Sequence, residues 1–561
     1  MGVAEQRDER YQPDEARELG PAALERRSER RAVWIMAGLT LVALVLRFWH
    51  LGSWNFQATE IFTLRDTDGP HFSNPRPLGY VLNYYLIRPF LPVDEFSLRL
   101  LPAICGVLAI PVLYAVARRL VGTGAALFSC LLLTVSPLHV MYSQLARYWA
   151  LVFLLCLVYP YTLYLGVRDR KPGVILLGIL AAILASLAHP VAILLLGGPA
   201  LVLAWRYLRP SELRQMWTRP IFRWGTLAAA VIVVMIAIRF VPILQGWISE
   251  HDNSPGGGQF LNWIPGTLGV KQVAIVLAYL ESLTVPVGVA GIAGTYLVWR
   301  EHSRSLGLFL TSVAVFPVLF LTLLSLRTPI SQYYLLPTTP VFLLGAGVFL
   351  DHVARLEWSL RPRWLVPGTL AAIFVASAAP TLFSDLRDGR RWDFRGAAQW
   401  LKPELSPGDL IFSDQYMVLS YYLPGAEVRR LRDRVGLREA ARELDQKGHT
   451  GALWIVAPAP SHPFRTNLRR GGLVDWLQAY CQLRHTRGVG RVDLRQHYLQ
   501  VYRCPPTAAR TGSQGDGNRQ AVSSVIRGGD LAGRREIPCG PAGRCTASSS
   551  DGPLPRARNA P

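Results

Sequence analysis

Blocks of roughly 18 to 20 apolar residues recur along the chain, and this is about the length of helix that crosses a bilayer. Polar or basic segments separate one block from the next. We count eleven blocks, at 33–50, 100–117, 125–142, 149–167, 174–188, 191–205, 225–244, one ending at Arg300, one ending near Leu326, 334–353 and 365–383. The pattern predicts an α-helical polytopic membrane protein with about eleven transmembrane helices.

The composition supports this class, since 51% of the 561 residues are hydrophobic and 17% are charged. The formal charge of +21 does not indicate nucleic acid, because the arginines lie mostly between apolar blocks. Basic clusters follow every even-numbered block, which the positive-inside rule explains. This places the segments 51–98, 136–151, 245–270 and 327–332, with everything after residue 383, outside the cytoplasm.

The two ends of the chain are expected to be disordered. Residues 1–32 carry charges of both signs, and we expect a cytoplasmic arm that precedes an uncleaved first helix. Residues 506–561 are rich in Gly, Ser, Arg and Pro without periodicity, which predicts a disordered tail.

Two segments interrupt the membrane pattern. The first loop, 51–98, is intermittently apolar, and Pro89 and Pro92 favour interfacial helices over a crossing. Residues 384–505 have a globular composition, with a helix predicted in DFRGAAQWLKPEL and strands in LIFS, GALWIVAP and HYLQVYR. We therefore expect a transmembrane domain over 33–383 and a small exported α/β domain over 384–505.

Cysteine usage fits this division of the chain. Cys105, Cys130 and Cys156 lie in apolar blocks, where they are expected to fill the core. Cys481 and Cys504 share the globular region and would form a disulfide if that region is exported.

The stretch SPLHVMYSQLARYWAL, residues 136–151, joins two apolar blocks and contains Arg147. An arginine between two hydrophobic spans either lies at the water interface beside lipid headgroups or serves a site. Arg99 is expected on the same outer side, and guanidinium groups there suit a lipid-linked phosphate. The residues themselves leave both interpretations open.

Glu60 lies in a largely uncharged run of the first loop, beside aromatic residues. A carboxylate in such a setting could act as a general base, or it could be an ordinary solvated acid. His189, at the outer end of the fifth block, could contact substrate or bond to the backbone.

The sequence contains no HExxH or paired CxxC motif, so no metal site is predicted. It also contains no GxxxxGK[ST] motif, which argues against a nucleotide-driven pump. No cofactor is expected.

The segments RLLPAICGVLAIPVLYAVARRLVG and SPLHVMYSQLARYWAL, with the later TPISQYYLLPTTPVFLLGAG and DFRGAAQWLKPELSPGDLIF, resemble the bacterial family 39 glycosyltransferases. This group is related to protein O-mannosyltransferases and the lipid A aminoarabinose transferase. The resemblance extends over about 33–504, and 99–151 is its most specific part. It implies a GT-C fold and transfer of a sugar from a polyprenyl-phosphate donor on the extracytoplasmic side.

The family carries an Asp-Glu pair in the first loop, and the matching residues here are Thr59 and Glu60. The aspartate is missing. The resemblance therefore leaves two alternatives: Glu60, Asp66 or Asp68 provides the catalytic carboxylate, or the enzyme is catalytically weak. Gln332-Tyr333 stands where the group commonly has Arg-Tyr, and Arg327 could substitute for that arginine. Arg76 lies within a variant of the family's HPPL run.

The combined hypothesis is a multi-pass glycosyltransferase of the bacterial inner membrane, with its active site and C-terminal domain extracytoplasmic. Its partners would be a polyprenyl-phosphate-linked sugar donor, a cell-envelope acceptor and the lipid bilayer, and not nucleic acid. The alternatives are a transporter or flippase, or a non-catalytic binder, of lipid-linked sugars. The residues expected at the site are catalytic Glu60 and Asp66, phosphate-binding Arg147, Arg99, Tyr142, Tyr148 and Arg327, and pocket-lining Arg76, His189, Gln332 and Tyr333.

Overall fold

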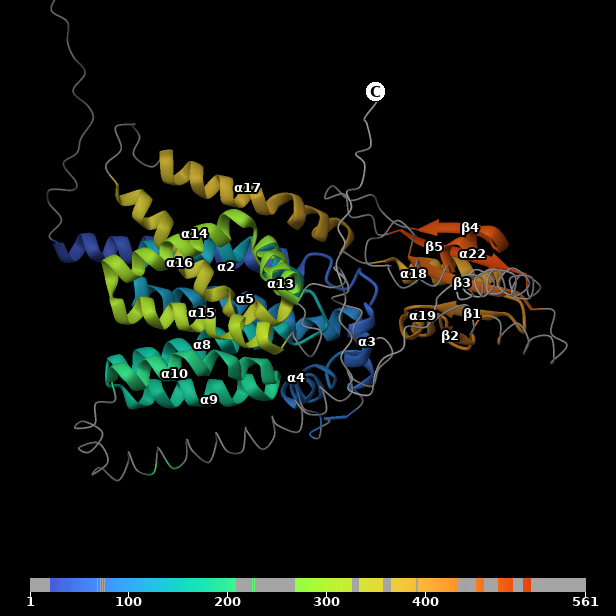
Figure 1. Ribbon diagram of the computed structural model, residues 1–561, viewed down its shortest axis with the longest axis horizontal. Helices are drawn as coiled ribbons and strands as arrows, with labels where there is room; N and C mark the ends of the chain where they lie inside the picture. The colour runs from blue at the N-terminus through green and yellow to red at the C-terminus, as the bar shows by residue number, and fades with distance from the viewer. Residues whose placement is uncertain are drawn as a thin grey trace, which may run out of the picture.

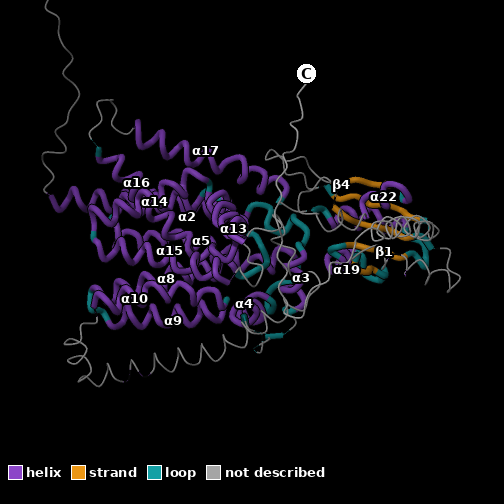
Figure 2. The backbone as a smooth tube through the Cα atoms, viewed as in Figure 1, coloured by secondary structure: helices purple, strands orange, loops and turns teal. Residues whose placement is uncertain are grey.

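The computed structural model describes residues 21–207, 268–324, 332–356, 365–389, 392–431, 451–458, 473–487 and 498–505, without positions 68, 71, 73 and 75. Single residues at 224, 227, 437 and 439 are also described. The described chain forms a helical bundle with a smaller unit containing a β-sheet beside one of its ends (Figure 1). Figure 2 shows that the strands are confined to this smaller unit.

The bundle contains six helices that are long and apolar enough to cross a membrane, or eight if each of two bent helix pairs counts as one span, among the described residues. The straight candidates belong to α2 (Pro21–Phe48), α5 (Glu95–Val121), α8 (Trp149–Arg168), α15 (Arg304–Leu324), η4 with α16 (Gln332–Thr338 and Thr339–Arg355) and α17 (Leu365–Asp388). Each overlaps an apolar block of the sequence. The mostly helical, multi-span class is therefore confirmed.

The remaining blocks depart from simple spans. The third becomes α6 (Thr123–Thr134) and α7 (Pro137–Ser143), with a 60° bend, and the eighth becomes α13 (Leu268–Leu283) and α14 (Val285–Leu297) with η3 (Val298–His302), bent by 100°. The fifth and sixth give the shorter helices α9 (Pro172–Ala188) and η2 with α10 (Pro190–Ile193 and Leu194–Tyr207). The block 225–244 lies outside the described residues, apart from position 227.

Small residues allow α14 and α16 to pack closely. A Cβ added at Gly294 would lie 1.7 Å from the carbonyl oxygen of Gly345, and one added at Gly345 would lie 2.1 Å from that of Gly291. Neither position could accept a larger residue without separating the helices. Such contact between small residues stabilises helix pairs in membranes, where burial from water supplies little energy.

The first loop forms short helices at the end of the bundle, as the sequence predicts. They are α3 (Ala58–Arg65), α4 (Pro77–Leu82) and the π-helical turn η1 (Asn83–Ile87). In Figure 1, α3 and α4 lie between the bundle and the sheet-containing unit.

The smaller unit contains a five-stranded sheet of order β2-β1-β3-β5-β4. Its strands are β1 (Leu410–Ser413), β2 (Val428–Arg430), β3 (Leu453–Pro458), β4 (Gln482–Arg487) and β5 (Leu499–Cys504), and its helices are α18 (Phe394–Leu401), η5 (Lys402–Glu404), α19 (Tyr416–Tyr422) and α22 (Leu473–Tyr480). β1 pairs in parallel with β2 and β3, whereas β5 pairs antiparallel with β3 and β4. The three strands and the helix predicted from the sequence are all present.

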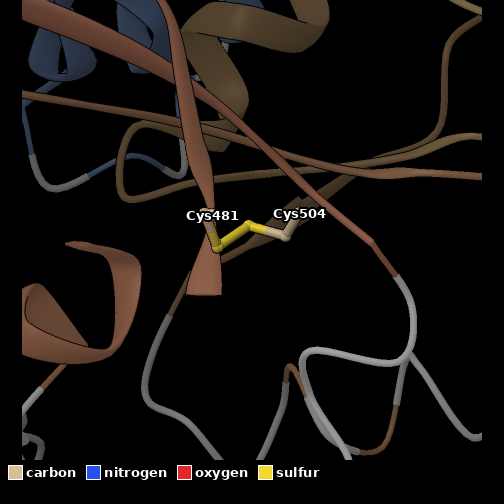
Figure 3. The surroundings of a disulfide bond; sticks show 2 residues. All are labelled: Cys481 and Cys504. Carbon is tan, nitrogen blue, oxygen red and sulfur yellow. A yellow bond between two sulfur atoms is a disulfide. The ribbon is translucent and has the colours of Figure 1, made fainter. Parts of the chain in front are cut away.

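A disulfide joins Cys481 to Cys504 (Figure 3). The bond links the start of β4 to the end of β5, two neighbouring strands of the sheet. Cys105, Cys130 and Cys156 are free and buried in the bundle, as expected for core residues.

The first loop and the sheet-containing unit share one apolar core. Side chains of the loop, α5 and the segment after α7 pack in one cluster with side chains of α18, α19 and the sheet, among them Phe56, Ile61, Leu98, Ala146, Phe394, Ala397, Val418 and Trp454. Polar contacts border this cluster. The Tyr422 hydroxyl donates to Glu95 Oε1 at 2.6 Å and accepts from the Phe56 amide at 2.8 Å, and Arg395 forms an ion pair with Glu95.

Candidate active site

A cavity of about 220 Å³ lies where the end of the bundle meets the first loop. Residues from five parts of the chain line it: the first loop with α3, the start of α4, α7 with the segment that leads to α8, η4, and the end of α17. The lining residues are Trp54, Gln57, Thr59, Arg76, Met141, Tyr142, Gln144, Leu145, Arg147, Trp149, Tyr333, Tyr334, Asp385 and Gly389.

The irregular segment after α7 positions Arg147 at the cavity. α7 begins at the Ser136 cap with Pro137 as its first residue, and it ends at Ser143. The Gln144 side chain then donates to the carbonyl oxygens of Leu46 and Trp49, each at 3.0 Å, which fixes the segment to the end of α2. Arg147 Nη1 lies 3.4 Å from Thr63 Oγ1 of α3, so its guanidinium group faces the first loop.

Arg76 reaches the same cavity from the N-terminus of α4. Its amide donates to Asn74 Oδ1 at 2.9 Å, and Pro77 provides the first residue of the helix. Burial lowers the pKa of the Arg76 guanidinium, and the positive charge of Arg147 acts in the same direction. Two partly desolvated cations beside one cavity favour an anionic ligand there.

Aromatic side chains form another part of the wall. The Trp149 ring centroid lies 5.2 Å from that of Tyr333 and 5.7 Å from that of Tyr334, and the Tyr142 centroid lies 6.4 Å from that of Tyr333. Cationic and aromatic surfaces therefore meet in one enclosure. The combination suits a ligand with a charged group beside an apolar or C–H-rich surface.

Glu60 and Arg99 do not line the cavity but bind each other in the interior, and both side chains are fully buried. Arg99 Nε lies 2.9 Å from Glu60 Oε1, and Arg99 Nη2 lies 3.1 Å from Oε2. The amides of Ala146 and Gln57 donate to the same carboxylate at 2.7 and 2.8 Å. Four donors around one carboxylate leave little capacity for a proton from substrate.

Arg99 is equally engaged with the protein backbone. Its Nη1 donates to the carbonyl oxygens of Leu51 and Trp54 at 2.9 and 2.8 Å, and its Nη2 donates to that of Asn55 at 3.1 Å. The expected pairing of Glu60 with an acceptor and of Arg99 with a donor phosphate does not match this geometry. Both side chains instead hold the first loop in place.

Three further predicted residues lie beside the cavity without lining it. Asp66 ends α3 and pairs with Arg65 at 2.9 Å. Tyr148 is buried against Tyr80, with ring centroids 5.1 Å apart, and burial holds the pKa of its hydroxyl well above the usual value. His189 Nδ1 accepts from the Val191 amide at 3.1 Å, so the histidine caps the turn that follows it.

The side chains of Arg327, Gln332 and Asp68 lie outside the described part of the chain. Of the predicted site residues, the structure brings Arg76, Tyr142, Arg147 and Tyr333 together at one cavity. No group of three His, Cys, Asp or Glu side chains that could hold a metal is found among the described residues.

The sequence does not single out Asp385 or Gln57, which also line the cavity. Asp385 follows the last apolar block by two residues, and the sequence predicts it to belong to the exported domain over 384–505. In the structure α17 extends to Asp388 and carries Asp385 to the cavity. One feature of the sequence could have indicated Asp385. It is an acidic residue directly after an apolar block, at the expected outer end of a helix. Gln57, at the N-cap of α3, carried no signal that distinguished it from a loop residue.

A segment that contributes residues to the cavity matches a known family model. Residues 81–239, which include both Arg99 and Arg147, match the family model described as dolichyl-phosphate-mannose-protein mannosyltransferase. The resemblance recognised in the sequence is thereby confirmed over this segment. A search of curated proteins finds no match.

Solved structures similar to the chain include ArnT from Cupriavidus metallidurans in the apo state, at 16% identity and a TM-score of 0.49, covering 86% of this chain and 99% of that one. ArnT bound to undecaprenyl phosphate matches at 16% identity and a TM-score of 0.49, covering 84% and 97% of the two chains. The Archaeoglobus fulgidus oligosaccharyltransferase in the apo form matches at 12% identity and a TM-score of 0.48, covering 76% and 69%.

Proposed function

We propose that the protein transfers a sugar from a polyprenyl-phosphate donor to a cell-envelope acceptor at the extracytoplasmic face of the bacterial inner membrane. The observation that carries the proposal is that Arg76 and Arg147 line one cavity together with a carboxylate, Asp385, and an aromatic wall. The matched family, whose description names a dolichyl-phosphate-linked sugar, supports the same donor class.

The two arginines supply what a leaving phosphate needs. When the bond between the sugar carbon C1 and the phosphate oxygen breaks, negative charge gathers on the phosphate. Guanidinium groups stabilise this charge through paired N–H donors, and they do so more strongly in a partly desolvated site. Arg76 and Arg147 would thus lower the barrier to transfer by binding the departing phosphate.

The cavity size limits what can enter. Its volume of about 220 Å³ is below the range of roughly 300–1,000 Å³ that is usual for drug-sized ligands. We infer that it holds a single sugar with its phosphate, while the polyprenyl chain lies along the apolar bundle. Tyr142, Trp149, Tyr333 and Tyr334 would contact the sugar and the first isoprene units.

The orientation belongs to the proposal. The basic clusters support a cavity end that lies outside the cytoplasm, and the Cys481–Cys504 disulfide supports an oxidising location for the sheet-containing unit. We propose that the transmembrane domain ends with α17 at Asp388, five residues beyond the expected boundary, and that the acceptor approaches from the sheet-containing unit that follows.

One observation favours an enzyme over a transporter of lipid-linked sugars. Asp385 and Arg147 line the same cavity, so a proton acceptor and a phosphate-binding group are available together. A transporter needs groups that bind its cargo but has no use for a base beside the bond to the sugar. The transfer would invert the sugar's configuration if the acceptor attacks C1 from the side opposite the phosphate.

The test uses the full chain, purified and reconstituted in nanodiscs. We expect it to bind undecaprenyl phosphate, and Arg147→Ala and Arg76→Ala each to weaken that binding about tenfold or more, as expected for lost hydrogen bonds to a charged group. Arg168→Ala, a change at an exposed arginine paired with Asp169, is the matched control and should bind as the wild type does.

The same preparations are then tested for transfer with polyprenyl-phosphate mannose and a panel of other polyprenyl-phosphate sugars. Loss of binding and of transfer in both cavity variants supports the proposal. Undecaprenyl phosphate binding that is equal in the wild type and the Arg147→Ala protein would overturn it. Movement of the lipid across proteoliposomes without any transfer would favour the transporter.

A further inference from the structure

Asp385 lies at the end of α17, where the chain is fixed against the first loop. Its carbonyl oxygen accepts from the Gly389 amide at 2.8 Å, which closes the last turn of the helix. Gly389 has a φ of +67°, and a Cβ there would lie 2.7 Å from the Trp54 ring. This close contact holds the end of α17 against the loop that carries Gln57 and Thr59.

The Asp385 side chain is 3% exposed and contributes the carboxylate found among the described residues that line the cavity. The other lining side chains offer amides, hydroxyls, aromatic rings and two guanidinium groups. Glu60, the acid that the sequence favoured, is buried behind the wall with four donors on its oxygens. Among the described residues, Asp385 of α17 is therefore the acid with access to the cavity.

We propose that Asp385 is the catalytic base of the sugar transfer, and that it orients and deprotonates the acceptor hydroxyl. This inference rests on the proposed function. As the acceptor oxygen forms its bond to C1 of the sugar, its proton passes to the Asp385 carboxylate. The bond from C1 to the phosphate oxygen breaks, and its electron pair leaves with the polyprenyl phosphate that Arg76 and Arg147 hold.

The charges at the cavity are consistent with this division of work. Arg76 and Arg147 carry two positive charges, and Asp385 carries one negative charge, so the three side chains together have a charge of +1. A phosphodiester donor carries one negative charge and would neutralise the set. The arginines attract the phosphate, and the carboxylate accepts a hydrogen bond from the acceptor hydroxyl.

Thr59 provides an internal check. It lines the same cavity from α3, at the position where the resemblance implies an aspartate. A carboxylate placed at either residue would face the same volume.

The experiment uses the full chain in nanodiscs and measures transfer and undecaprenyl phosphate binding side by side. We expect Asp385→Asn to lower kcat by roughly 10²- to 10⁴-fold, the usual contribution of a general base. Binding of undecaprenyl phosphate should be retained, because the arginines are intact. Asp169→Asn, at an exposed turn beside Arg168, is the matched control and should transfer at the wild-type rate.

Two further variants make the test specific. The double variant Thr59→Asp, Asp385→Asn should have a kcat at least tenfold higher than that of Asp385→Asn, because it returns a carboxylate to the cavity from the other wall. Asp385→Glu should transfer with a measurable rate and a pH profile shifted from that of the wild type. A purely structural role for Asp385 would produce neither the recovery nor the shifted profile.

The outcomes separate this inference from the proposed function. If the wild type transfers sugar and Asp385→Asn transfers equally well, Asp385 is not the base, although the proposed function stands. If the wild type neither binds undecaprenyl phosphate nor transfers any sugar, the proposed function fails first. A loss of both binding and thermal stability in Asp385→Asn, without recovery in the double variant, would also overturn the inference.

Discussion

Glu60 and Arg99 form a buried ion pair that connects three parts of the chain. Arg99 belongs to α5 and gathers carbonyl oxygens of Leu51, Trp54 and Asn55, while Glu60 accepts from the Ala146 amide. Ala146 directly precedes Arg147. The pair thus fixes the segment that presents Arg147 to the cavity, and its effect on the site is indirect.

Breaking this pair should destabilise the protein. Glu60→Gln leaves Arg99 without its counter-charge in the interior, and removing one partner of a buried pair typically costs about 3–5 kcal/mol. We expect a lower thermal unfolding temperature and weaker undecaprenyl phosphate binding together, measured on the purified protein. The double change Glu60→Leu, Arg99→Met removes both charges and should recover part of the stability.

One result would contradict a structural role for Glu60. If Glu60→Gln unfolds at the wild-type temperature and binds undecaprenyl phosphate normally but does not transfer, Glu60 acts in the chemistry, as the sequence suggested.

The sequence identified both arginines of the cavity and two of the five aromatic residues that line it, Tyr142 and Tyr333, but not its acid. Arg147 and Tyr142 could be predicted because they lie where an apolar block ends, whereas Arg76 and Tyr333 were expected from the resemblance to the family 39 glycosyltransferases. Thr59 and Glu60 are adjacent, yet one residue is about 100° of rotation on a helix, so they face different surroundings. Which of the two faces the cavity depends on how α3 packs, and local sequence does not specify that.

Arg47 stabilises the bend between α6 and α7. The bend interrupts the helical hydrogen bonds, and Arg47 compensates by donating to the carbonyl oxygens of Leu133 at 3.0 Å and Thr134 at 3.2 Å. Its Nη2 also lies 2.8 Å from His139 Nδ1 of α7. One buried guanidinium thereby sets the direction in which α7 leads toward Arg147.

Removing Arg47 should therefore disturb the bend between α6 and α7 and not only its own hydrogen bonds. Arg47→Ala removes the side-chain donors from two buried carbonyl groups and leaves that of Leu133 with the Ser136 amide at 3.3 Å. An unsatisfied buried carbonyl group, as at Thr134, costs about 1–3 kcal/mol. We expect a clearly lower thermal unfolding temperature and weakened undecaprenyl phosphate binding, measured on the same samples. Arg31→Ala, an exposed arginine at the other end of α2, is the control. Unchanged stability in the Arg47→Ala protein would show that the bend is maintained by other contacts.

The sequence predicted where the helices lie but not where they bend. Apolar blocks located the helices because length and hydropathy suffice for that purpose. The block 125–142 was read as one span, although Ser136 and Pro137 form the start of a second helix within it. The eighth block divides at Thr284, whose φ of +71° ends α13 and allows the 100° bend. Such breaks depend on buried partners elsewhere in the chain.

At the scale of the whole molecule, the bundle and the sheet-containing unit meet through a shared core and the contacts of Glu95. The sequence predicted the strands from their β-branched and aromatic residues. It could not predict that Phe56 and Ile61 of the first loop pack with Phe394 and Trp454, because those contacts join residues more than 300 positions apart. Distant packing of this kind follows from the complete fold.

The proposed orientation predicts which face of the membrane exposes the disulfide. In a Cys539→Ser, Cys545→Ser background, a membrane-impermeant thiol reagent should label Cys481 and Cys504 in intact spheroplasts only after treatment with an impermeant reductant. The buried cysteines of the bundle should remain unlabelled. A Cys481→Ser, Cys504→Ser variant controls for labelling elsewhere. Labelling that requires lysis would place the sheet-containing unit in the cytoplasm.

The location of Asp385 on α17 also has a consequence for the order in which the protein is made. Arg76 and Arg147 leave the ribosome more than 200 residues before Asp385 does. During synthesis, the cavity would gain its affinity for phosphate before it gains its base. A nascent chain would thus bind the polyprenyl-phosphate-linked sugar without transferring it. The bond between the sugar and the phosphate would stay intact until α17 has inserted.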